Sequence, residues 1–107
     1  MTKYELLTLA LLAAKAAAET HANDDDGGTC NFDTACIVLP RWNRELTRKA
    51  FAAAGLRTDI WKFPRASAYM VLGCYTGQGD RRTNQAEAIR DCLEASGYEA
   101  HVYYQMD

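Results

Sequence analysis

The order of apolar and turn-forming segments constrains this chain more than any other feature. After an alanine- and leucine-rich stretch at 2–21, short β-type runs alternate with helix-sized segments. Glycine, proline, asparagine and aspartate separate the segments, because these residues favour turns through backbone geometry and local hydrogen bonding. We predict strands and helices from periodicity and residue type. The strands are at 36–39, 58–63, 68–75 and 98–105, and the helices are at 2–21, 43–54 and 84–95.

After the first helix the order is strand, helix, strand, strand, helix, strand. This order predicts an α+β fold, a ferredoxin-like split β-α-β sandwich (βαββαβ) preceded by an extra N-terminal helix. The length of 107 residues fits one domain, 1–107, with the helix at 2–21 and the ferredoxin-like unit at 34–105. Helices would cover one sheet face. The other face, or the first helix, would suit a homodimer.

The first helix has the spacing of a core helix. Lys3 and the leucines after it resemble a signal peptide superficially, but Glu5 and Lys15 interrupt the apolar run. The run is also too short to span a membrane. We therefore expect a cytoplasmic protein whose first helix packs on the domain through one face, formed by Tyr4, Leu7, Leu11, Ala14 and Ala18.

The sequence also predicts caps for the other two helices and an inner face for the second. Asn43 is expected to cap the second helix and Gly55 to end it. Helical spacing predicts an inner face of Leu46, Ala50 and Ala53. In the third helix, Asn84 and the glutamate three residues later form a capping-box-like pair.

Charge and cysteine content exclude some function classes. A net charge of −2 argues against general nucleic-acid binding, which needs a basic excess. Three of the four cysteines lie in apolar segments and are expected to be reduced core thiols. A disulfide or a metal site stays open as an alternative. No cofactor is predicted. The cysteines are Cys30, Cys36, Cys74 and Cys92.

The segment 77–84, between a strand and a helix, is the first candidate binding loop. Amides at a helix start attract anions, and two arginines would add charge and forked donors. The alternative is a flexible turn with two solvated arginines. The glycine spacing is not that of a P-loop or a dinucleotide fingerprint. The binding residues predicted here are Gln78, Asp80, Arg81, Arg82 and Asn84.

The segment 24–33 is the second candidate binding loop. Three consecutive aspartates could hold calcium or magnesium, but the spacing is not that of an EF-hand, so no metal ligand is assigned. A solvated turn is the plainer interpretation. The following residues mix glycine, polar and aromatic types, as binding loops do. The binding residues predicted here are Asp26, Thr29, Asn31 and Asp33.

No catalytic residue is assigned. Cys30 could act as a nucleophile with His21 or His101 as its base, but the sequence does not bring them together. Exposed aromatic residues could instead anchor a partner. The candidates for this role are Trp42, Trp61 and one of Tyr103 and Tyr104, the other tyrosine being expected to face the core.

Three strings, at 27–33, 77–88 and 102–107, resemble a group of small phage and prophage accessory proteins. The resemblance covers 24–107 and leaves the first helix outside it. It implies a non-catalytic protein that inhibits a bacterial defence system, CRISPR effectors included, by contact with a host protein or defence complex. Two alternatives stay open. One is a protein that sequesters a phosphate-bearing molecule or nucleotide at 77–84, and the other is a small cysteine- or metal-dependent enzyme.

Overall fold

The computed structural model describes residues 1–28, 32–61 and 67–105. It confirms the α+β class, with helices and an antiparallel sheet in one compact unit. The elements in chain order are α1 (Lys3–Glu19), β1 (Thr34–Val38), α2 (Arg44–Ala53), β2 (Ile60–Trp61), β3 (Ala68–Met70), α3 (Gly79–Ala95) and β4 (Glu99–Tyr103).

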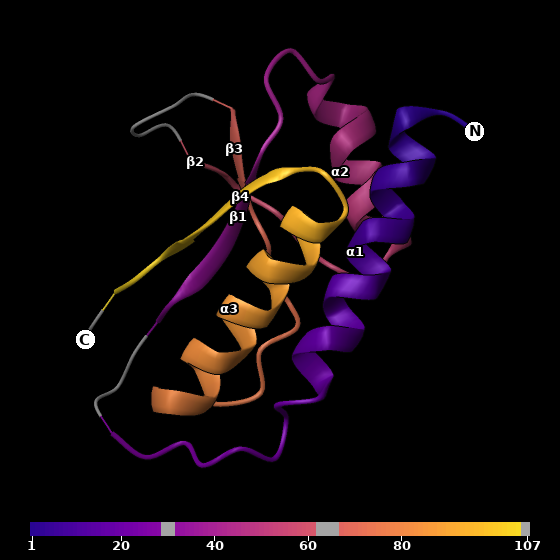
Figure 1. The fold of residues 1–107 in the computed structure, drawn as a ribbon. Coiled ribbons are helices and arrows are strands. Elements are labelled where there is room, and N and C mark those ends of the chain that lie inside the picture. The colour runs from indigo at the N-terminus through magenta and orange to yellow at the C-terminus, as the bar shows by residue number, and fades with distance from the viewer. Residues whose placement is uncertain (29–31, 62–66, 106–107) are drawn as a thin grey trace.

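The sheet has the order β2-β3-β1-β4, and all neighbouring strands are antiparallel. β3, β1 and β4 form its main part, and the two-residue β2 extends one edge. Ile37 of β1 lies between Tyr69 of β3 and Ala100 of β4. These three side chains are buried and point to the face that the helices cover, as the alternation of side chains along a strand requires. Figure 1 shows the three helices on one side of the sheet.

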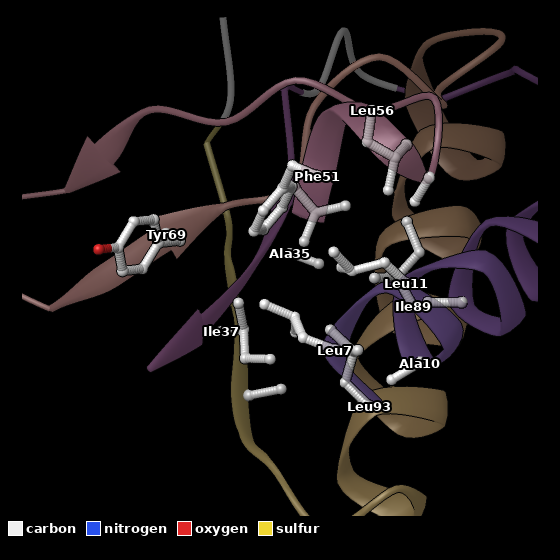
Figure 2. Packing of buried hydrophobic residues seen from close by; sticks show 14 of the residues in the cluster. Leu7, Ala10, Leu11, Ala35, Ile37, Phe51, Leu56, Tyr69, Ile89 and Leu93 are labelled. Atoms are coloured by element: carbon white, nitrogen blue, oxygen red, sulfur yellow. The ribbon is translucent and has the colours of Figure 1, made fainter. Parts of the chain in front are cut away.

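α1 occupies the middle of the helical layer. It packs against both α2 and α3, which themselves make no close main-chain contact with each other. Leu7, Leu11, Ala14 and Ala18 have no exposed surface, which confirms four of the five residues of the predicted packed face; Tyr4 is half-buried. In Figure 2, Leu7 and Leu11 lie among side chains from the other two helices and the sheet.

The residues predicted to begin and end α2 are confirmed. The Asn43 side chain accepts a hydrogen bond from the Leu46 N–H at 2.9 Å, as predicted. Gly55 follows the helix with φ of 76°, the left-handed conformation that favours glycine. α1 begins with a capping box between Thr2 and Glu5, which the sequence analysis did not identify.

The predicted inner face of α2 is wrong at two of its three positions. Ala50 is buried, but Leu46 is 43% exposed and Ala53 is also exposed. The buried face runs through Thr47, Ala50 and Phe51. Phe51 stacks on Tyr69 of the sheet, with ring centroids 6.4 Å apart. Burial of this large ring sets the rotation of the helix, so that Leu46 turns outward.

Two other predicted boundaries are wrong. α3 begins at Gly79, five residues before the predicted start, so Asn84 lies inside the helix and caps nothing. β3 ends at Met70, Leu72 then pairs with Arg57 in an isolated bridge, and Gly73 follows with φ of 93°. Part of the predicted strand at 58–63 lies outside the described residues.

The C-terminal tyrosines also differ from expectation, because both are exposed. Ala100 occupies the core-facing position of β4, so Tyr103 points to the face without helices. Among the residues described, no helix is long and apolar enough to cross a membrane.

Leu11→Ala should test the central position of α1. We expect a loss of about 2–5 kcal/mol in the free energy of unfolding, because the change removes buried surface and leaves a cavity. Chemical denaturation measures the loss. Leu9→Ala on the same helix is the control, since Leu9 is 53% exposed and should cost less than about 1 kcal/mol. Equal losses for both variants would contradict the central position of α1.

Candidate functional site

The two candidate loops lie against each other at the start of α3, although the residues that form hydrogen bonds between them are 49 to 60 positions apart in the chain. The Asp80 N–H donates to the Gly27 carbonyl at 3.1 Å. The Arg81 Nε–H donates to the Asp24 carbonyl at 2.7 Å. We call this set of contacts between 24–33 and the first turns of α3 the loop clamp. The structure therefore brings together residues that the sequence placed in separate sites.

Arg81 is directed at protein groups. Besides Asp24, its guanidinium donates to the Thr76 carbonyl at 2.9 Å and lies 3.9 Å from the Asp26 carboxylate. Its side chain is only 23% exposed. One arginine thus ties the 24–28 loop to the segment before α3.

Arg82 joins the same clamp to β1. Its Nε–H donates to the Asp33 carbonyl at 2.7 Å, and its Nη2 donates to the Thr34 hydroxyl at 3.1 Å. The guanidinium carbon lies 4.0 Å from the centre of the Tyr75 ring, a cation–π contact. With both arginines occupied in this way, the phosphate-binding interpretation of 77–84 finds no support in these contacts.

Asp33 is almost completely buried, and its carboxylate is bonded on both oxygens. One oxygen accepts from the Thr83 hydroxyl at 2.6 Å, and the other accepts from the Gln105 N–H at 2.9 Å. A buried carboxylate needs such partners because it has lost its hydration. Asp33 thereby connects α3 to the chain beyond β4.

Asp24 links the loop to the end of α1 and to α3. Its Oδ2 lies 2.7 Å from the His21 Nδ1 and accepts from the Asn84 Nδ2 at 2.9 Å. Two hydrogen bonds hold the pKa of Asp24 below its ordinary value of 3.8. The bond with His21 has the larger effect, and the bond from Asn84 has the next largest. Asn84 therefore acts in the clamp rather than as a cap.

A glycine is required where α3 begins. Gly79 has φ of 59°, and a Cβ atom there would collide with the main-chain oxygens of Gly27 and Asp26. Only glycine lets the helix start this close to the loop. The sequence pattern showed the glycine but not the neighbour that requires it.

Two further residues complete the clamp and were not singled out from the sequence. Gln85 has no exposed surface and exchanges hydrogen bonds with Thr76, while its amide also donates to the Ala18 carbonyl at 3.3 Å. The Tyr75 hydroxyl accepts from the Ala35 N–H at 2.9 Å. A polar residue in the apolar face of a predicted helix was the only available signal for Gln85.

The outer surface of the clamp is acidic. Asp25, Asp26 and Asp80 are exposed, and so is Gln78. Of the predicted binding residues, Thr29 and Asn31 lie outside the described part of the chain. The two arginines of the clamp are thus directed inward, whereas the carboxylates of Asp25, Asp26 and Asp80 are exposed.

The aromatic residues predicted to anchor a partner differ in how far their side chains are exposed. Trp42 packs edge-on against Tyr4 and Tyr98, with ring centroids 5.1 and 6.4 Å away. It therefore serves the domain rather than a partner. Tyr104 is 55% exposed, and its hydroxyl donates to Glu87 at 2.7 Å. The Trp61 side chain lies outside the described part of the structure.

The cysteines that the structure describes are free thiols. Cys74 is buried, which raises its pKa to about 11, and burial also raises the pKa of Cys36. Both are therefore protonated near neutral pH and poor nucleophiles. Cys30 lies outside the described residues. Within the described ranges, no group of histidine, cysteine, aspartate and glutamate side chains is arranged to hold a metal ion.

Arg82→Met should test the clamp. We expect a loss of about 2–4 kcal/mol in unfolding free energy, since two hydrogen bonds from a charged donor and a cation–π contact disappear while the stem is kept. Arg90→Met is the control, because Arg90 pairs with the exposed side chains of Asp91 and Glu94. It should cost less than about 1 kcal/mol. Urea denaturation of both variants measures the two losses in unfolding free energy. Similar losses for both would contradict the role of Arg82 in the clamp.

The lowered pKa of Asp24 predicts how stability depends on pH. The folded state favours the carboxylate, so the contribution of Asp24 is complete well above the unfolded value of 3.8. It is lost as the pH falls through the lower folded pKa. The stability difference between wild type and Asp24→Asn should therefore be largest near neutral pH and shrink below pH 3.8. Denaturation of both proteins at a series of pH values measures this difference. If the difference between wild type and Asp24→Asn stays constant down to acid pH, the prediction is contradicted.

The site is a closed polar network with an acidic exterior, built on the start of α3. Its donors and acceptors are bonded to one another. Comparison with protein-family models, with curated protein sequences and with solved structures finds no match.

Proposed function

We propose that this protein is a non-catalytic binding protein that holds a basic surface of a protein partner. The contact is made by the acidic surface, defined as Asp25, Asp26 and Asp80. One observation carries the proposal: the loop clamp uses Arg81 and Arg82 internally and leaves these three carboxylates in solvent.

The clamp favours binding because it fixes the carboxylates before a partner arrives. The loop is tied to α3 through Asp80, Arg81 and Asn84. A surface that is ordered in advance loses less conformational entropy on association. Complementary charge then increases the rate of encounter and the selectivity for basic partners.

We also propose a specific fold, the ferredoxin-like unit, for the part that follows α1. The order β2-β3-β1-β4 with antiparallel neighbours supports this assignment. So does the succession of β1, α2, β2, β3, α3 and β4 along the chain. α1 would be an addition that separates the two helices of this unit.

Inhibition of a bacterial defence complex is the form of binding that the resemblance to phage accessory proteins favours. Effectors of such systems handle nucleic acid through basic surfaces. An acidic surface on a small protein can occupy a basic surface of that kind. The partner class is therefore a nucleic-acid-handling protein of a defence system.

Charge reversal tests the proposal. The purified protein is passed over a panel of immobilised defence effectors, and its binding is measured by biolayer interferometry. We expect the wild type to bind at least one effector and Asp25→Lys/Asp26→Lys/Asp80→Lys to lose that binding. The matched control carries the same charge change on exposed carboxylates away from the clamp, at Glu45, Asp91 and Glu94.

Each outcome bears on the proposal. Binding by wild type and control but not by the clamp variant supports the acidic surface. Equal binding by all three proteins would overturn it. If no effector in the panel is bound, the proposed inhibition of defence complexes is wrong.

A further inference from the structure

A groove of about 350 Å³ lies between α2 and the edge of the sheet, away from the loop clamp. Arg48 and Ala52 of α2 form one side. The connection from Leu56 to Asp59 forms the other, and Leu72 also lines the groove. This volume is at the lower end of the range for ligand-binding pockets. It suits a few side chains better than a large cofactor.

Thr58, on the strand side of the groove, has polar groups without partners. Its hydroxyl oxygen is buried and has no hydrogen bond within the described ranges. A buried hydroxyl without a partner costs free energy, so sites of this kind commonly gain one from a ligand or water. A lining residue of the groove thus carries a buried hydroxyl that has no partner among the described residues.

The main chain beside the groove is an open sheet edge. Arg57 and Leu72 exchange N–H to carbonyl bonds of 2.9 and 3.0 Å, and the Met70 N–H donates to the Asp59 carbonyl at 2.9 Å. Residues 57 and 59 therefore face β3. In an antiparallel ladder the alternate residues face the other way, so Thr58 and Ile60 direct their N–H and carbonyl groups away from the sheet. β2 is the outermost strand of the described sheet, and an edge strand can pair with an added strand.

The charge of the groove indicates what it accepts. Arg48 and Arg57 are exposed, and neither forms a salt bridge with a residue that the structure describes. Asp59 is the single carboxylate among the lining residues. Two guanidinium groups against one carboxylate favour an anionic group, and guanidinium geometry suits a carboxylate.

We propose that this groove binds an extended peptide segment that carries a carboxylate. The peptide adds as a strand beside β2, with its main chain bonded to Thr58 and Ile60. Its carboxylate lies at Arg48 and Arg57, and an apolar neighbour packs on Leu56 and Leu72. This is strand addition at a sheet edge, in which main-chain bonds provide affinity and side-chain contacts provide specificity. The carboxylate comes from an aspartate, a glutamate or the end of the peptide chain.

A displayed random heptapeptide library tests the proposal. Selection against the wild-type protein is paired with counter-selection against Arg48→Glu/Arg57→Glu. We expect the enriched peptides to contain aspartate or glutamate and to bind the double variant at least about tenfold more weakly. Arg44→Glu on the same helix is the matched control, because it reverses a charge outside the groove and should leave binding intact. Synthetic peptides with free and amidated ends distinguish a terminal carboxylate from a side chain.

Amide hydrogen exchange distinguishes strand addition from charge attraction alone, because charge attraction would not protect main-chain amides. The amides of Thr58 and Ile60 should become protected when an enriched peptide binds. Thr58→Pro removes one of these amides and should therefore weaken peptide binding. Proline is tolerated on an edge strand, so the variant should still fold, which its melting temperature checks.

Two results would overturn the proposal. One is a selection that yields no peptide preferring the wild type over Arg48→Glu/Arg57→Glu. The other is peptide binding that leaves the Thr58 and Ile60 amides unprotected. The variant with reversed charges at Asp25, Asp26 and Asp80 should keep its peptide binding, so the groove and the acidic surface can fail independently.

Discussion

Burial of one face of α1 between α2 and α3 is the constraint on which the rest of the structure depends. Leu7 and Leu11 are fully buried there, and the two outer helices touch α1 rather than each other. The N-terminal helix fills the position between α2 and α3, so the helical layer is three helices wide. Removal of α1 would expose the sides of α2 and α3 that pack on it, and the domain would lose the apolar burial of Leu7 and Leu11.

The loop clamp depends on this arrangement because it starts where α1 ends. His21 reaches Asp24 just beyond the helix, and Gln85 of α3 bonds the Ala18 carbonyl near its C-terminal end. The position of α1 thus places the 24–28 loop against Gly79. Once the loop is there, Arg81 donates to the Asp24 carbonyl and Asp80 to the Gly27 carbonyl, while Arg82 donates to the Asp33 carbonyl, because main-chain oxygens that have lost contact with water require donors. The orientation of the arginines is a consequence of packing, and the acidic exterior follows from it.

The acidic surface and the groove differ in chemical character. The acidic surface presents carboxylates on a tightly bonded loop, and it suits a folded partner with a basic surface. The groove presents an edge of the described sheet and two guanidiniums, and it suits an extended, anionic segment. The first lies at the start of α3, and the second lies beside α2 and β2. Opposite charge at separate places would let one small domain contact two partners or two parts of the same partner.

Local sequence alone determined the class of the fold, the place of most elements and the buried face of α1. Periodicity and capping are properties of neighbouring residues, so Leu11 and Asn43 could be assigned without a structure. The rotation of α2 was beyond such reasoning, because Phe51 finds its partner in β3. The start of α3, the inward direction of Arg81 and Arg82, and the open edge at Thr58 were decided by tertiary structure. Their partners lie far away in the chain, with Asp33 49 positions from Arg82. A hydrogen bond between distant segments forms only after packing has brought them together, and no local pattern records it.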